Sequence, residues 1–425
     1  MTAPTAPAPV RALRPAVRWL AGSIAVGIVG LYLSQHLWWR TLSWAVGSVL
    51  VWSVALPLAI LALGARKWMV ALVVALALGP LSLSLAQNLS ASHPTFLQRH
   101  DGGVLVTGAA ADQAAHGRNP YTADFSPVLG HEWHIVHLAG GNVANPVATH
   151  EPYLPASFLV NVPPMEVAHA VGLGWDPRIL YVAVVALAVA LVLLEDAPLG
   201  VRLAMVCGVG NALVRDFTAW GTNDAVAGCL FLVALLLAAK RPRWAGVALA
   251  VAVSFKFLLL MPAIPLLALV VRRDGWAGLR KWWTAPATLV ATSLPFLVAA
   301  PRAFVQDTVL YNFGLTKDHF PTTGLGLPAV AGQVFHGPLL GLVTLGLFAL
   351  GIAGPIWAVR RWPTTGVASL AGAFGLLCLL VPARTFQVHY LVMVAVLAAG
   401  GWLAVRPPRG LFDRPAPQVE ADPAT

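Results

Sequence analysis

The chain has 425 residues, of which 58% are hydrophobic and only 10% are charged, and its mean hydropathy is +0.75. This composition lies far outside the range of soluble domains, so a water-soluble globular fold is excluded and an all-α polytopic membrane protein is indicated. The net charge of +10 is interpreted as a topology signal, because basic residues mark cytoplasmic loops, and nucleic acid is not expected as a partner.

The apolar runs, taken in chain order, predict the membrane part. Residues 1–16 form a Pro/Ala-rich stretch, which we expect to be a disordered cytoplasmic tail, as we do for 405–425. The 244–271 run is interrupted by Lys256, so we interpret it as a hairpin of two short helices. At about 20 residues a span, this predicts a single domain, 17–404, with a bundle of about 12 spans and both termini cytoplasmic. The runs are 17–39, 42–64, 68–86, 177–194, 199–215, 218–239, 244–271, 284–300, 339–359, 366–382 and 387–404.

Two polar stretches, 87–176 and 301–338, separate these runs. Most Lys and Arg fall in the connections on the opposite side, so both stretches are predicted to be extracytoplasmic loops. Within the first, Tyr153–Trp175 is amphiphilic and broken by prolines, which favours juxtamembrane helices on the outer leaflet. Chemistry is therefore expected on the extracytoplasmic face.

Two acidic residues of the first loop are candidates for acid–base chemistry. Asp101 follows the third run directly, where partial burial would raise its pKa toward that of a general base. A helix N-cap or a solvated loop residue is the other interpretation of Asp101. Glu151, in HEPYLP, is interpreted as a second catalytic acid, a sugar-hydroxyl ligand or an exposed loop residue.

Several polar side chains near the predicted outer surface are candidates for binding a polar ligand, although GRNPY as a bare pattern is simply a turn. Asn119 and Tyr121 lie in the turn sequence GRNPY, and Tyr153 follows Glu151. Asn223 and Asp224, in GTND, stand at the outer start of a long apolar run; they are expected either to bind a polar ligand or to cap a helix. His319 of the second loop is a further candidate.

Lys256 is the most informative charge in the membrane part, because an unpaired ammonium in hydrocarbon costs several kcal/mol. Its anionic partner is either the phosphate of a lipid carrier or a structural carboxylate, for which Asp224 and Asp216 are candidates. Arg384 and Lys317 are candidates for neutralising a phosphate leaving group. Arg384 has the alternative of snorkelling to phospholipid head groups.

The sequence contains no motif that indicates a metal site or a nucleotide-binding site. More than half of the 12 histidines lie in the first loop, but HEWHIVH lacks the HExxH spacing, so we predict no metal and no cofactor. The chain has no phosphate-binding Gly-rich loop with Lys-Ser/Thr, no G-x-S-x-G and no DxD pair. We therefore expect that the sugar donor is not a nucleotide. The three cysteines, Cys207, Cys229 and Cys378, lie inside apolar runs and are expected to serve packing.

The order of these features resembles the GT-C glycosyltransferases. An Asp after an early span, GRNPY, a Pro-broken YLP segment, GTNDAVAG with a long apolar helix, and the Lys of VAVSFKFLLLMP follow one another from about Ser82 to Leu403. More narrowly, the chain resembles glycosyltransferase family 87, the polyprenol-phosphate-mannose-dependent mannosyltransferases and their relatives.

This resemblance implies a GT-C-like bundle whose active site lies on the outer face. Asp101 then matches the catalytic base, Lys256 and Arg384 hold the donor phosphate, and either His389 or His319 lies near the catalytic acid. The implied reaction transfers a sugar, mannose by analogy, from a polyprenyl-phosphate donor to an envelope glycolipid or glycan, with inversion, in the plasma membrane.

Two other functions fit the composition. A lipid or sugar transporter would use Lys256, Asp224 and Asp216 as intramembrane polar sites, although no internal repeat supports it. A non-catalytic envelope-assembly protein would keep the same fold without activity.

Overall fold

The computed structural model describes residues 51–90, 101–129, 134–138, 141–330 and 337–404. This part of the chain is mainly helical, and its strands pair only as two two-stranded sheets. The predicted tails, 1–16 and 405–425, and the first apolar run lie outside the described residues.

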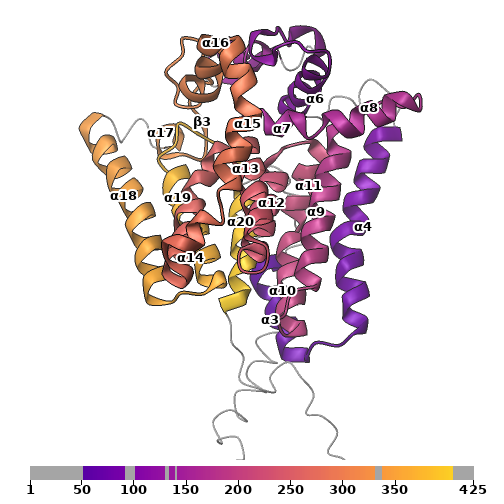
Figure 1. Cartoon of the computed structure of the whole chain (residues 1–425), viewed down its shortest axis with the longest axis vertical. Coiled ribbons are helices and arrows are strands. Elements are labelled where there is room, and N and C mark those ends of the chain that lie inside the picture. The colour runs from indigo at the N-terminus through magenta and orange to yellow at the C-terminus, as the bar shows by residue number, and fades with distance from the viewer. Residues whose placement is uncertain (1–50, 91–100, 130–133, 139–140, 331–336, 405–425) are drawn as a thin grey trace, which may run out of the picture.

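The apolar runs form a block of helices with α4 at one side and α18 at the other (Figure 1). The helices follow the predicted runs closely, because long stretches of Ala, Leu and Val satisfy their backbone hydrogen bonds internally. The block contains a π-helical turn η1 (Val51–Ala55), α3 (Leu56–Leu63), α4 (Trp68–Ser90), α9 (Pro177–Leu193), α10 (Leu199–Val209), α11 (Ala212–Trp220), α12 (Asp224–Leu237), α13 (Pro242–Phe255), α14 (Leu260–Arg280), α15 (Thr284–Ala299), α18 (Gly337–Arg361), α19 (Thr365–Leu380), α20 (Leu391–Gly400) and η9 (Gly401–Ala404).

Two predicted boundaries were wrong, and in both cases a polar or glycine residue interrupts an apolar run. The run 199–215 is two helices, because Asn211 caps the start of α11 by accepting the Val214 N–H at 3.0 Å. The next run does not begin at residue 218. Gly221, in the left-handed conformation with φ 89°, ends α11, and α12 begins only at Asp224.

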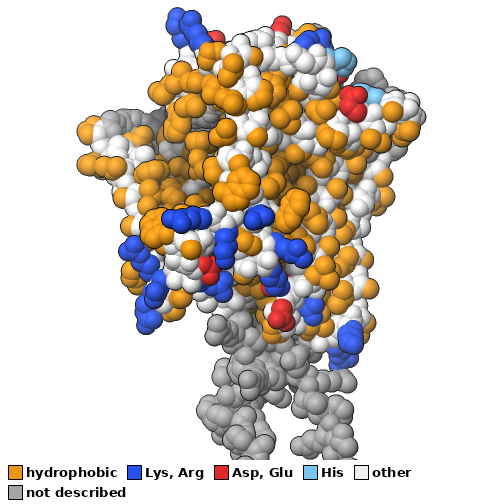
Figure 2. Space-filling model, in the orientation of Figure 1, with side chains coloured by type: hydrophobic (Ala, Val, Ile, Leu, Met, Phe, Trp, Pro, Cys, Tyr) orange, Lys and Arg blue, Asp and Glu red, His pale blue; other side chains and the backbone are white. Residues whose placement is uncertain are grey.

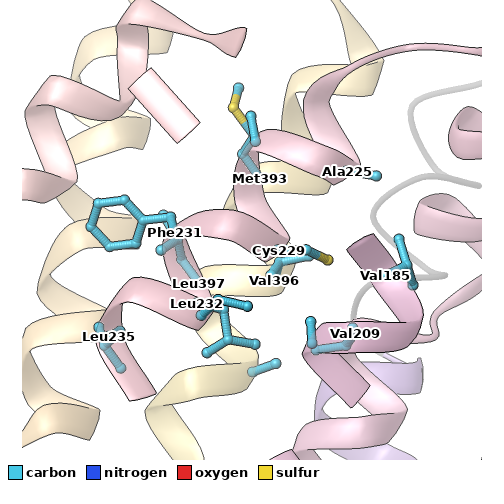
Figure 3. Packing of buried hydrophobic residues seen from close by; sticks show 14 of the residues in the cluster. Val185, Val209, Ala225, Cys229, Phe231, Leu232, Leu235, Met393, Val396 and Leu397 are labelled. Atoms are coloured by element: carbon cyan, nitrogen blue, oxygen red, sulfur yellow. The ribbon is translucent and has the colours of Figure 1, made fainter. Parts of the chain in front are cut away.

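Helix α12 lies at the centre of the core (Figure 3). Its Cys229 and Leu232 are fully buried, and Val396 of α20 and Val185 of α9 belong to the same apolar cluster. Gly228 allows the close approach of α20, since a Cβ at this position would lie 3.3 Å from the Val396 Cβ. All three cysteines are free and buried, which confirms their predicted packing role.

Two of the described helical segments are long and apolar enough to cross a membrane, Trp68–Ala86 and Pro338–Arg361. Shorter apolar helices of 10–17 residues make up most of the remaining block. These segments support membrane association, whereas the count of about 12 spans stays a prediction.

The two predicted outer loops together cover one end of the block (Figure 1). The prolines of Tyr153–Trp175 limit this segment to two short helices, α7 (Ala156–Leu159) and α8 (Val162–Ala170). Val167 of α8 and Val171, directly after it, are each 67% exposed. Their contact with a lipid leaflet stays a prediction. The first loop forms α6 (Gly102–Ala115), the 3₁₀ turns η2 (Pro120–Thr122), η3 (Ser126–Val128) and η5 (Pro146–Ala148), the antiparallel pair β1 (Ile135–Leu138) and β2 (Gly141–Ala144), α7 (Ala156–Leu159) and α8 (Val162–Ala170).

The second loop is tied to the start of the last helix. It forms α16 (Pro301–Val305), a π-helical turn η7 (Gln306–Tyr311), β3 (Thr323–Gly324) and α17 (Leu327–Val330). Strand β3 pairs in parallel with β4 (Thr385–Phe386), which precedes the 3₁₀ turn η8 (Val388–Tyr390) and α20. Residues far apart in the sequence therefore meet at this end of the block.

Candidate active site

Asp101 is held at the start of α6 by its backbone. Its N–H donates to the Trp220 carbonyl at 2.7 Å, which joins α6 to the end of α11. Asp101 occupies the N-cap position, but its side chain accepts no capping hydrogen bond. The Gly103 N–H is nevertheless close enough to the Asp101 carboxylate to lower its pKa, so Asp101 combines the N-cap position with a place beside the other charged residues.

Lys256 lies in a break between α13 and η6 (Phe257–Leu259), with an extended backbone at φ −148° and ψ 107°. Asn223 fixes this break, because its side-chain amide donates to the Phe255 carbonyl at 3.3 Å. The end of α13 is thereby joined to the start of α12. Asn223 thus acts as a brace between helices rather than as the side-chain cap that the sequence offered as an alternative.

Asp224, Lys256 and His389 form the charged centre of the site. The Lys256 Nζ lies 3.4 Å from Asp224 Oδ1, and the His389 Nε2 lies 3.7 Å from Asp224 Oδ2. Asp224 is 0% exposed, yet neither of its carboxylate oxygens has a hydrogen-bond partner among the described residues. The predicted carboxylate partner of Lys256 is Asp224, since Asp216 pairs with Arg215 at 2.6 Å.

Aromatic rings surround the ammonium. The Lys256 Nζ lies 4.8 Å from the centroid of the Tyr390 ring and 5.5 Å from that of Tyr153. Such contacts stabilise a cation by about 0.5–2 kcal/mol. Phe217 packs edge-on against His389 with ring centroids 5.7 Å apart. The ion pair of Lys256 and Asp224 is therefore bounded by aromatic rings.

Tyr153 and Asp101 approach the same glycine. A Cβ at Gly103 would lie 2.9 Å from the Tyr153 Oη and 3.0 Å from Asp101 Oδ2. Burial raises the pKa of Asp101, while nearby His389 and Lys256 lower it and Asp224 raises it; the net direction is upward. A carboxylate with a raised pKa is a stronger base, as general-base catalysis requires.

Glu151 is fully buried, so it is not the exposed loop glutamate of one interpretation. Its Oε1 accepts the Tyr153 N–H at 3.2 Å, and its own N–H donates to Asp307 Oδ2 at 2.9 Å. Burial raises the pKa of Glu151 to about 8, with Asp307 adding to this rise and the Tyr153 N–H opposing it. The contact of Glu151 with the site is therefore indirect, through Tyr153.

Asn119 and Tyr121 lie behind the site. Asn119 accepts the Tyr121 N–H at 3.1 Å and donates to the Phe296 carbonyl at 3.4 Å. Tyr121 is 4% exposed and its hydroxyl donates to the Tyr153 carbonyl at 2.7 Å. Tyr121 braces the backbone of Tyr153 and Asn119 braces Tyr121, while their contact with a sugar stays a prediction.

Neither Arg384, just before the last helix, nor Lys317, in the second loop, forms an ion pair with Asp224 among the described residues, and their contact with a phosphate stays a prediction. The Arg384 guanidinium donates to the carbonyls of Gly314 and Phe320, at 3.4 and 3.3 Å, so it holds the loop together. Lys317 is exposed, and the His319 Nδ1 makes a local hydrogen bond, donating to the Thr316 carbonyl at 2.7 Å. Of the two candidate histidines, His389 is the one that the fold brings to Asp224.

Sequence reasoning missed Phe217 and Asp307 at this end of the molecule, and it considered His150 only as one of the first-loop histidines that could bind a metal. Their only sequence signal is a polar or aromatic side chain near a predicted outer surface, which many other residues share. The pairing of His150 with Asp307 spans 157 positions in the chain, so no local pattern could indicate it.

The described residues contain no group of three or more His, Cys, Asp or Glu side chains that could hold a metal ion. His93, His100 and His131 of the first loop lie outside the described ranges. The absence of a metal and of a cofactor therefore stays a prediction.

The family model for glycosyltransferase family 87 matches residues 155–386, more than half of the chain. No curated protein and no solved structure matches significantly. The matched range includes Asp224 and Lys256, whereas Asp101 and His389 lie outside it. The fold nevertheless brings these flanking residues to the same centre, so the site joins the matched region to the segments on either side.

Proposed function

The chain belongs to glycosyltransferase family 87, and on that premise we propose that it transfers a sugar from a polyprenyl-phosphate donor to an envelope glycolipid or glycan. We further propose that the sugar is mannose. The protein acts in the plasma membrane as a multi-pass protein, with its site on the extracytoplasmic face and both termini in the cytoplasm.

The observation that carries this proposal is the buried charged centre. Three charged groups meet there. They are the Lys256 ammonium in the break after α13, the buried Asp224 carboxylate at the start of α12, and the Asp101 carboxylate, which has a raised pKa, at the start of α6. An ammonium bounded by tyrosine rings suits a phosphate carried by a lipid. A buried carboxylate with free lone pairs suits the hydroxyl groups of a sugar.

Each residue then has a role in an inverting displacement. Lys256 binds the donor phosphate, and Asp224 accepts hydroxyl groups of the sugar. The acceptor hydroxyl oxygen attacks the anomeric carbon, the bond from this carbon to the phosphate oxygen breaks, and polyprenyl phosphate leaves with the bonding electrons. Asp101 takes the proton of the acceptor hydroxyl, and His389 orients Asp224. We propose that no metal takes part in this scheme and that the Lys256 ammonium contacts the leaving phosphate.

The test compares wild type with Asp101→Asn in nanodiscs that contain radiolabelled polyprenyl-phosphate mannose and envelope lipids. EDTA is present throughout. We expect wild type to form a labelled product and Asp101→Asn to lose turnover by about 100-fold or more while still binding the donor, because an amide cannot take the proton.

Asp112→Asn is the matched control, because Asp112 lies on the same helix but pairs at the surface with Arg118. It should behave as wild type. Full activity of Asp101→Asn would refute the assignment of the base. Movement of unmodified donor across the bilayer, without transfer, would instead support a transporter.

A further inference from the structure

Three buried residues, His150, Glu151 and Asp307, join the two outer loops beside the site. Asp307 Oδ1 lies 2.7 Å from the His150 Nδ1, and Asp307 Oδ2 accepts the Glu151 N–H at 2.9 Å. Their exposed fractions are 4%, 0% and 3%. We call these three residues the loop junction. Asp307 lies on the π-helical turn η7, so the loop junction fastens η7 to the segment that leads into Tyr153.

The hydrogen bonds continue from the loop junction to the site. The Glu151 Oε1 accepts the Tyr153 N–H, and the Asn312 side chain, next to η7, donates to the Pro152 carbonyl at 2.9 Å. On the other side of Tyr153, the Leu154 N–H donates to the Ser254 carbonyl at 3.1 Å. The Tyr153 ring is thereby placed against Lys256, and its hydroxyl beside Asp101.

Two buried acidic residues are an energetically costly way to hold two loops together, and Asp307 is joined to Glu151 through the Glu151 backbone N–H. Burial of carboxyl groups is unfavourable unless each is paired or neutral, and apolar residues of similar size often stabilise as well. The loop junction also leaves the His150 Nε2 and Glu151 Oε2 without hydrogen-bond partners in the described part of the chain. Stability alone therefore does not explain these residue types.

We propose that the loop junction positions Tyr153 against Lys256 and Asp101, so that the second outer loop controls the geometry of the reaction centre. This inference rests on the proposed function for its kinetic consequences. His150, Glu151 and Asp307 are positioning residues, since their contacts reach the site only through the Tyr153 segment.

The protonation state of Glu151 decides whether the loop junction holds. The titratable groups that face it are Asp307 of η7, His150 and Tyr153 of its own segment, and Tyr121 of η2. Burial raises the pKa of Glu151 to about 8, so below this pH the side chain is neutral and is tolerated beside the Asp307 carboxylate. Above it, a second negative charge repels η7 and loosens the Tyr153 segment.

The kinetic test compares Glu151→Gln, Asp307→Asn and the control Asp318→Asn, an exposed acid of the same loop. Glutamine has the shape and charge of the neutral acid. We expect Glu151→Gln to keep kcat within about threefold of wild type at about pH 7 and to lack the wild-type fall above about pH 8. Asp307→Asn should lower kcat by about 100-fold, because misplacement by about 1 Å has such effects. The control should match wild type.

Equal alkaline falls in wild type and Glu151→Gln would overturn the proposal, as would wild-type kcat in Asp307→Asn. A second readout needs no turnover. Because the folded-state pKa of Glu151 lies above its usual value of 4.5, its contribution favours the folded state below pH 4.5 and is lost as the pH rises to about 8.

The Tm of wild type should therefore fall more steeply than that of Glu151→Gln across this pH window. Parallel Tm profiles would refute the loop junction even if the enzyme is active. Divergent profiles in a protein that transfers no sugar would refute only the proposed function.

Discussion

The ion pair of Lys256 and Asp224 has two proposed roles: it stabilises two buried charges in the folded protein, and it binds the donor phosphate. The Lys256 side chain is 12% exposed and that of Asp224 is not exposed, so each charge depends on the other. The ammonium lies 3.4 Å from Asp224 Oδ1 and keeps further donors that a phosphate can use. The sequence predicted either a phosphate or a carboxylate as the partner of Lys256. Asp224 is the carboxylate partner, and a phosphate can still bind to the same ammonium.

A double substitution of Lys256 and Asp224 separates the effect on stability from the effect on donor binding. We expect Lys256→Met to destabilise the protein by about 3–5 kcal/mol, because it leaves a buried carboxylate unpaired. Adding Asp224→Asn should restore most of this stability, since the remaining charge is removed. Donor binding should stay weakened by about tenfold or more in the double variant, because no ammonium contacts the phosphate.

Thermal unfolding and donor-lipid binding in nanodiscs measure the two effects. Asp216→Asn serves as the control, since Asp216 is a partly exposed acid that pairs with a different residue, Arg215. Recovery of donor affinity together with stability in the double variant would show that Lys256 has only a structural role.

The turn between α11 and α12 is the element that places the start of α6. Three consecutive residues contribute: the Ala219 carbonyl accepts Arg178, the Trp220 carbonyl accepts the Asp101 N–H, and Gly221 has φ 89°. A Cβ at Gly221 would lie 2.7 Å from Val104 Cγ1. The backbone of this turn, rather than any of its side chains, therefore sets the position of Asp101.

Gly221→Ala should damage both the fold and the site. The left-handed conformation disfavours any residue with a Cβ by about 1–2 kcal/mol, and the contact with Val104 pushes α6 away. We expect a lower Tm and a fall in kcat larger than any rise in KM. Gly117→Ala is a suitable control, because Gly117 also has a positive φ, 70°, but has open space around it. An equal loss of kcat in both variants would contradict the role of the turn.

The predictability of these elements differed with their chemistry. Helices of the block were predictable within a few residues, because apolar length is a local property of the sequence. The helix ends were less predictable, because Asn211 and Gly221 cap α11, and a hydropathy pattern does not reveal caps. At the site, Asp101, Lys256 and His389 were predicted, but the burial of Glu151 and its link to Asp307 depend on a contact between distant loops.

Charged side chains are unevenly distributed over the face of the molecule shown in Figure 2. On the face shown, Lys and Arg gather toward the end of the block opposite the outer loops. Arg241, Arg243, Arg280 and Lys281, at the turns that flank α13 and α15, are all exposed, and so is the neighbouring Trp244, at 65%. Basic residues with tryptophan are typical of the cytoplasmic membrane interface. The orientation of the chain in the membrane stays a prediction, because it was inferred from these same basic residues.

Cysteine labelling in intact cells tests this orientation. The native cysteines are buried, so their background with a membrane-impermeant maleimide should be low. We expect Asp318→Cys, in the second outer loop, to react in intact cells, and Arg243→Cys to react only after the membrane is permeabilised. Reversed labelling would invert the topology and place the site on the cytoplasmic face.

The site also lies where helices begin. Helix α6 starts directly after Asp101, and α12 starts with Asp224 itself. The first N–H groups of a helix carry a partial positive charge, equivalent to roughly half a unit at each N-terminus, and this macrodipole attracts anions. The two helix ends favour the ionised carboxylates and an incoming phosphate alike. No side-chain substitution or change of pH removes this backbone field, so even a variant without Lys256 should retain a residual attraction for an anionic donor.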